Sequence, residues 1–143
     1  MISEEEADTK MEGGSIRVWI AFEVLAVSES VVKDSLGKMI ENLDKDKRIS
    51  LYKKSFTDIV KVEKPLKNID IAYSCTCEIE CVVKKLEDLV LIVIQYGPSA
   101  VEILEPTKFD ISSREAQNIM NSVSEMMHMF AAAGVGGLVF LNK

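Results

Sequence analysis

Histidine and cysteine are scarce in this chain of 143 residues, which has one histidine and three cysteines. A structural zinc site takes four ligands, almost always from cysteine and histidine. Cys75, Cys77 and Cys81 lie close together in the sequence, but no fourth cysteine accompanies them, and His128 is far along the chain. His128 has no serine or cysteine motif beside it, so we expect no catalytic residue and no cofactor.

Basic residues are outnumbered, with 17 lysines and arginines against 23 aspartates and glutamates and a net charge of −6. Affinity for nucleic acid depends on clustered basic residues, so nucleic acid is not an expected partner. Much of the negative charge lies in residues 1–14, which end in Gly13-Gly14. We therefore predict a flexible acidic tail over residues 1–14 and a single domain over residues 15–143.

Long hydrophobic runs are also missing. The longest purely apolar run, residues 89–94, is much shorter than the ~20 residues that a membrane-spanning helix needs. The acidic N-terminus lacks the apolar segment of a secretory signal. Three cysteines on one predicted strand face are typical of a reducing compartment. We therefore expect a cytoplasmic protein that does not contact a membrane.

A strict alternation is the clearest pattern present. Every odd position from Ile69 to Val83 is apolar or cysteine, whereas the even positions are mostly polar. This period of two predicts a long strand with one dry face. The three cysteines fall on that face, where small side chains pack well in a core. Cysteines two residues apart share a face, however, and thiolates bind soft metals, so a metal-binding or thiol-dependent protein using Cys75, Cys77 and Cys81 is the alternative.

Hydrophobic periodicity, together with the residues that start and stop helices and strands, predicts the remaining elements. Near Tyr52 the apolar residues change from odd-numbered to even-numbered positions. This parity change indicates either a bulge or a break into two short strands. Ser112 and Glu115 have the spacing of a capping box, which marks the start of the last long helix. The predicted elements are strands at 16–27, 49–62, 69–84, 100–105 and 138–141 and helices at 28–43, 86–96 and 112–134.

The order of these elements resembles the ferredoxin-like split βαβ plan. The resemblance implies an α+β fold with a βαββαβ antiparallel sheet, both helices on one face, an added C-terminal helix and a short strand. The chain also resembles small uncharacterised archaeal proteins of this architecture. Regulatory domains of the amino-acid-sensing (ACT-like) type share the plan and bind ligands near a glycine-bearing strand-to-helix loop. The equivalent loop here, residues 26–30, has no glycine.

The loop after the second predicted helix is the candidate ligand site. Tyr96, Gly97 and Ser99 surround a Gly-Pro turn that we expect to leave free backbone amides for an unidentified small molecule. The alternative interpretation is an ordinary helix-to-strand turn.

Some apolar residues exceed what one small domain covers easily. Leu91 and Ile92 lie off the main stripe of their predicted helix, and the last helix has a broad methionine-rich stripe. We therefore expect a homo-oligomer and, as function, a non-enzymatic self-associating module with a binding or regulatory role. The predicted interface residues are Leu91, Ile92, Met126, Met127 and Phe130.

Overall fold

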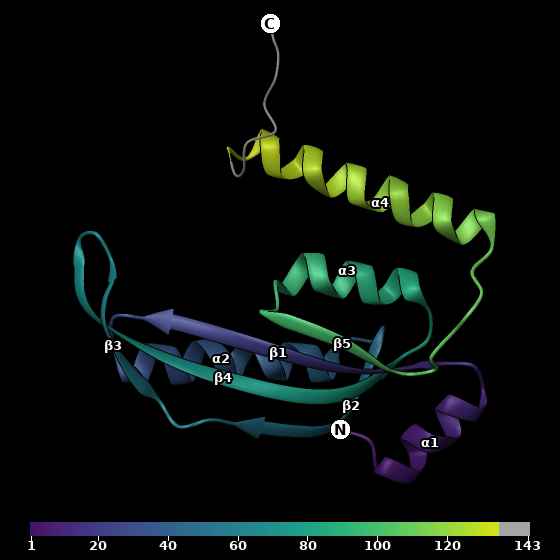
Figure 1. Ribbon diagram of the computed structural model, residues 1–143, viewed down its shortest axis with the longest axis horizontal. Helices are drawn as coiled ribbons and strands as arrows, with labels where there is room; N and C mark the ends of the chain where they lie inside the picture. Colours follow the sequence, from purple (N-terminus) through teal and green to yellow (C-terminus); the bar gives the residue numbers. More distant parts are fainter. Residues whose placement is uncertain (135–143) are drawn as a thin grey trace, which may run out of the picture.

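The computed structural model describes residues 1–134 and has an α+β architecture with four helices and five strands (Figure 1). The predicted short strand at 138–141 lies outside the described residues. The elements are α1 (Glu4–Glu12), β1 (Ile16–Ala26), α2 (Glu29–Lys45), β2 (Ile49–Phe56), β3 (Val60–Leu66), β4 (Ile69–Val83), α3 (Leu86–Tyr96), β5 (Ala100–Glu105) and α4 (Ser113–Ala132).

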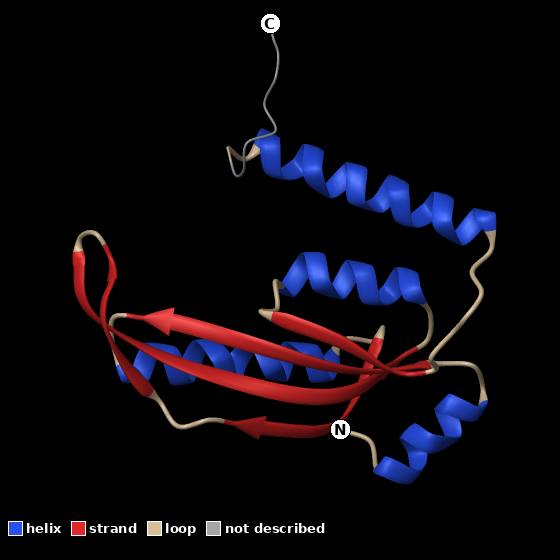
Figure 2. Ribbon diagram, in the orientation of Figure 1, coloured by secondary structure: helices blue, strands red, loops and turns tan. Residues whose placement is uncertain are grey.

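The five strands form one antiparallel sheet in the order β2-β4-β1-β5, and β3 also pairs with β4 (Figure 2). The strands that flank α2 in the sequence, β1 and β2, are separated in the sheet by β4. This split arrangement confirms the predicted ferredoxin-like plan. The nearly continuous apolar strand β1 lies between β4 and β5, as expected for a central strand.

Strand β4 is the longest element of the sheet, with 15 residues. It pairs with β1 from Ile16↔Val83 to Ala26↔Tyr73. On its other side, β4 pairs with β3 in its first half and with β2 in its second half. The register with β2 shifts between Leu51 and Lys53, and residues 57–59 separate β2 from β3. The predicted bulge and the predicted break are therefore both present.

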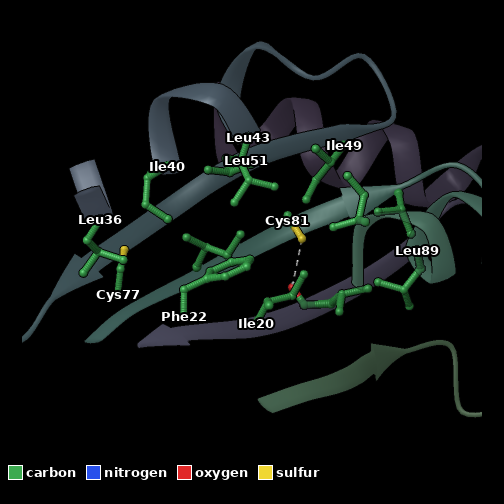
Figure 3. Close-up of a cluster of buried hydrophobic side chains, with 14 of the residues drawn as sticks. Ile20, Phe22, Leu36, Ile40, Leu43, Ile49, Leu51, Cys77, Cys81 and Leu89 are labelled. Carbon is green, nitrogen blue, oxygen red and sulfur yellow. Dashed lines mark hydrogen bonds between the residues drawn. The ribbon is translucent and has the colours of Figure 1, made fainter. Parts of the chain in front are cut away.

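One face of the sheet carries the hydrophobic core, and residues of both α2 and α3 belong to it. Figure 3 shows core side chains such as Leu36 and Leu43 of α2 and Leu89 of α3. The odd-numbered residues of β4 meet even-numbered residues of β1 in this layer, because each pair shares a side of the pleat. The buried core comprises Ile16, Val18, Ile20, Phe22, Val32, Leu36, Ile40, Leu43, Ile49, Leu51, Cys75, Cys77, Ile79, Cys81, Val83, Leu89 and Ile92.

The first residues form helix α1, so the prediction of a flexible tail is wrong. Ser3 and Glu6 make a reciprocal capping box at its start, and Ala7 is fully buried. The backbone amide of Ile2 donates to the carbonyl oxygen of Leu51 at 2.9 Å, which ties the N-terminus to β2. These contacts compensate for the weak hydrophobic pattern of the helix.

Helix α4 lies on the side of α3 that faces away from the sheet (Figure 1). The Ser112 hydroxyl accepts from the amide of Glu115 at 3.0 Å and caps the helix, and Gly134 has a φ of 78° after its end. Ile119, Val123 and Met126 are half-buried, and no residue of α4 is fully buried. None of the helices in residues 1–134 has the length and apolar character needed to cross a membrane.

Candidate functional site

The three thiols point into the core, as the alternation predicts. Cys75, Cys77 and Cys81 are all buried and unpaired by disulfides. Burial raises the pKa of the Cys77 thiol to about 11 and that of the Cys81 thiol to about 12. The Cys81 sulfur lies 3.5 Å from the carbonyl oxygen of Val18, to which the thiol donates (Figure 3). These two thiols are therefore protonated at neutral pH.

A metal site requires several ligand side chains to converge on one point. Within residues 1–134, no group of three or more histidine, cysteine, aspartate or glutamate side chains has a geometry that could hold a metal ion. The cysteines share their layer with apolar side chains such as Ile79 and Phe22. His128 is exposed on α4.

The predicted ligand loop has no free amides at the two positions named for it. The amide of Gly97 donates to the carbonyl oxygen of Val93 at 3.0 Å, as part of a left-handed helix cap. The amide and the hydroxyl of Ser99 both donate to the carbonyl oxygen of Ala21, at 2.8 and 3.1 Å. The Tyr96 hydroxyl donates to Asp46. The prediction of free ligand-binding amides is wrong, and the loop is a closed turn between α3 and β5.

The predicted interface residues fall into three groups by exposure. Ile92 is 0% exposed and belongs to the core, so its assignment to an interface is wrong. Leu91 and Met126 are half-buried, whereas Met127 and Phe130 are exposed on α4.

An apolar groove runs between α3, β5 and α4, with a volume of about 610 Å³. Val101 and Ile103 of β5 pair with Ile20 and Val18 of β1, and therefore face the side of the sheet that carries α3. Both side chains remain partly exposed, at 40% each. Val123 is the residue that α4 contributes to the lining. The lining is Leu89, Val90, Val93, Ile94, Val101, Glu102, Ile103 and Val123.

A second groove, of about 820 Å³, lies between α2 and the residues that join β2 to β3. Sequence reasoning missed it, because its walls come from parts of the chain that carry no shared motif. One local signal was present: Gly37 interrupts an otherwise regular helix pattern.

Comparison with known families covers the sheet and the helices α2 to α4. A family model matches residues 17–137, which is most of the chain. The chain belongs to the MJ0538 family. The match to the MJ0538 family extends from β1 through α4, and α1 precedes it. A comparison with curated proteins found no match.

Proposed function

We propose that this protein is a non-enzymatic binding module that acts as a homodimer, in which the edge of β5 and the exposed flank of α4 meet their counterparts in a second copy. The observation that carries the proposal is the exposure of α4, which has 20 residues and none buried. Short isolated helices are marginal in water, and most helical stability comes from packing an apolar face.

The exposed apolar side chains of α4 include Met120, at 69% exposure, with Met127, Met129 and Phe130. Complete burial of such a side chain contributes about 1.5–3 kcal/mol. A standard interface takes about 800 Å² from each partner, which is a patch about 30 Å across. A helix of 20 residues is about 30 Å long, so α4 matches that dimension.

Strand β5 supports the same geometry, because within residues 1–134 it pairs with β1 on one side only. Its outer edge presents backbone donors and acceptors to any strand of suitable register. A two-fold axis beside β5 would join the sheets of two copies edge to edge. It would also bring the groove between α3, β5 and α4 of one copy next to the same groove of the other. Such self-complementary contacts are the commonest in homodimers.

Native mass spectrometry tests the proposal. We expect a dimer of about 32 kDa, twice the chain mass of 15.9 kDa. The double variant Met120→Glu/Met127→Glu places two charges on the exposed flank and should give a folded monomer. Asn121→Glu, an exposed polar position on the same helix, is the matched control and should stay dimeric. A wild-type monomer at micromolar concentration would overturn the proposal.

The same spectrum examines the thiol-dependent or metal-binding alternative. A protein that used Cys77 and Cys81 as thiolates would have to overcome the burial that raises their pKa values. Metal retained by the native protein at a fixed stoichiometry would favour that alternative over a module without a cofactor.

A further inference from the structure

The groove between α2 and residues 56–59 has the properties of a small-molecule site. Its volume of about 820 Å³ lies within the usual range of ligand pockets, about 300–1,000 Å³. It is lined by α2, by the β2–β3 connection and by Cys75 of β4, and not by α3, β5 or α4. An inference about it is therefore independent of the proposed dimer.

The break between β2 and β3 forms one wall of the groove. β2 remains paired with β4 as far as Phe56↔Cys77. The chain is then held by Thr57, whose amide donates to the Thr76 carbonyl oxygen at 2.9 Å and whose Oγ1 accepts from the Thr76 amide at 3.0 Å. Phe56 shares the core face with Cys77, yet it is 47% exposed. This wall therefore presents an aromatic ring that its own chain leaves partly uncovered.

Gly37 keeps the opposite wall open. It lies inside α2 and is half-buried, and a Cβ built on it would meet no atom within 4 Å. Glycine in a helix interior is less favourable than alanine, and no close packing requires it here. The absent side chain leaves space facing the groove that the protein itself does not fill.

The chemistry of the lining is apolar at the bottom and acidic around it. Leu36 and Cys75 are buried at the base of the groove, at 1% and 6% exposure. Phe56 and Ile59 form an apolar part of its wall. Among residues 1–134, no ion pair involves any charged residue of this groove. The charged lining comprises four carboxylates and two ammonium groups: Glu29, Asp34, Glu41, Asp58, Lys33 and Lys38.

We infer that this groove binds a small molecule with an apolar body and a protonated amine. The apolar body would cover Phe56, Ile59 and the space beside Gly37, where it gains from leaving water. The amine would lie among the exposed carboxylates, which outnumber the lysines and favour a cation over an anion.

Amide proton–nitrogen correlation spectra of the full chain test this inference with three probes of one shape: phenylbutylamine, phenylbutanol and phenylbutanoate. We expect the amine to shift the signals of Gly37 and Ile59 at millimolar concentration. We expect the amine to bind about tenfold more tightly than the carboxylate, with the alcohol between them. Absence of shifts at these amides with all three probes would overturn the inference. Equal binding of amine and alcohol, or a preference for the carboxylate, would overturn its charged part.

A variant pair separates groove filling from damage to the fold. Gly37→Leu should lower amine affinity by about tenfold or more without lowering the melting temperature. Gly37→Ala, a smaller change, should give an intermediate loss and a higher melting temperature. Ser35→Leu adds the same side chain to an exposed position of α2 outside the groove and should leave affinity unchanged. Unchanged affinity in Gly37→Leu would contradict the site.

Discussion

Arg48 donates hydrogen bonds to both carboxylate oxygens of Asp46, from Nη2 at 2.6 Å and from Nε at 3.0 Å. The same Nη2 also donates to the side-chain oxygen of Gln95 at 2.6 Å, and the Tyr96 hydroxyl donates to Asp46 at 3.3 Å. This cluster joins the α2–β2 connection to the last turn of α3. Bidentate charge-assisted bonds of this kind are stronger than neutral ones and are specific in geometry.

The Asp46 cluster should make stability depend on pH in the acid range. Hydrogen bonds from Arg48 lower the pKa of Asp46 from 3.8 to about 2. Because the pKa of Asp46 is lower in the folded state, its contribution to stability is complete when the pH is above the pKa of the unfolded state. That contribution is lost as the pH falls from about 4 to about 2. We expect Asp46→Asn to lower the free energy of unfolding by about 2 kcal/mol at neutral pH. Urea titrations at several pH values measure this.

The control for that experiment is Asp110→Asn, at an exposed position before α4. It should leave stability at neutral pH within about 0.5 kcal/mol of the wild type. A constant difference between Asp46→Asn and the wild type down to about pH 2 would contradict the assigned role, since the pair must be lost once the carboxyl is protonated.

The buried thiols should be nearly inert in the folded protein. With a pKa of about 11, only about one Cys77 thiol in a thousand is ionised at pH 8, and Cys81 is ionised less still. We expect an aromatic disulfide reagent to modify these two cysteines at a rate limited by unfolding. Peptide mass mapping after timed quenching follows each cysteine separately. Rapid modification of native Cys77 or Cys81 would show that the core opens at this layer.

Two glycines should respond to alanine in opposite directions. Gly37 has helical geometry and open space around its Cβ position, so Gly37→Ala should raise the free energy of unfolding by about 1 kcal/mol. Gly97 has a φ of 58°, in the left-handed region, so Gly97→Ala should lower it by about 1 kcal/mol. Thermal and chemical denaturation of the two variants measure the pair. Destabilisation by Gly37→Ala would mean that the groove wall has less space than the structure shows.

Arg17 should hold α1 against the sheet. It donates to Asp8 of α1 at 2.6 Å and to Glu105 at 3.1 Å, and it lies 5.1 Å from the centre of the Tyr52 ring. Both carboxylates are largely exposed, so solvent reduces the benefit to about 1 kcal/mol. Arg17→Met should therefore speed amide exchange in residues 4–12 by about fivefold.

Arg114→Met is the control for that measurement, because Arg114 is exposed at the start of α4. It should leave exchange in residues 4–12 unchanged. If Arg17→Met also had no effect there, α1 would be held by Ala7 and the N-terminal backbone contacts instead of by the arginine.

Local sequence patterns were sufficient to predict which side chains of β4 and β2 face the core. The alternation in β4 and the parity change near Tyr52 report directly on which side chains face the core, and the structure confirms both. Helix α1 was missed because only Ala7 is buried in it, which leaves no apolar stripe to recognise. Its capping box, Ser3 with Glu6, was nevertheless readable in the sequence.

Long-range contacts account for the other errors. Helix α3 is apolar on most sides because it lies between the sheet and α4, so the stripe read from the sequence left out Ile92, although Ile92 packs in the core with Leu89. The bond partner of Ser99 is Ala21, which is 78 residues away in the sequence, and no local signal reveals it. The groove beside Gly37 likewise depends on where β2 leaves the sheet.

The register of β4 makes this strand intolerant of changes in length. One added residue between Cys75 and Cys77 would reverse the orientation of every side chain on one side of the insertion relative to β1, β2 and β3. Carboxylates such as Glu78 would then face the layer beneath α2, and isoleucines would face water. Loops elsewhere in the chain can lengthen at little energetic cost, whereas the middle of β4 admits substitution but not insertion.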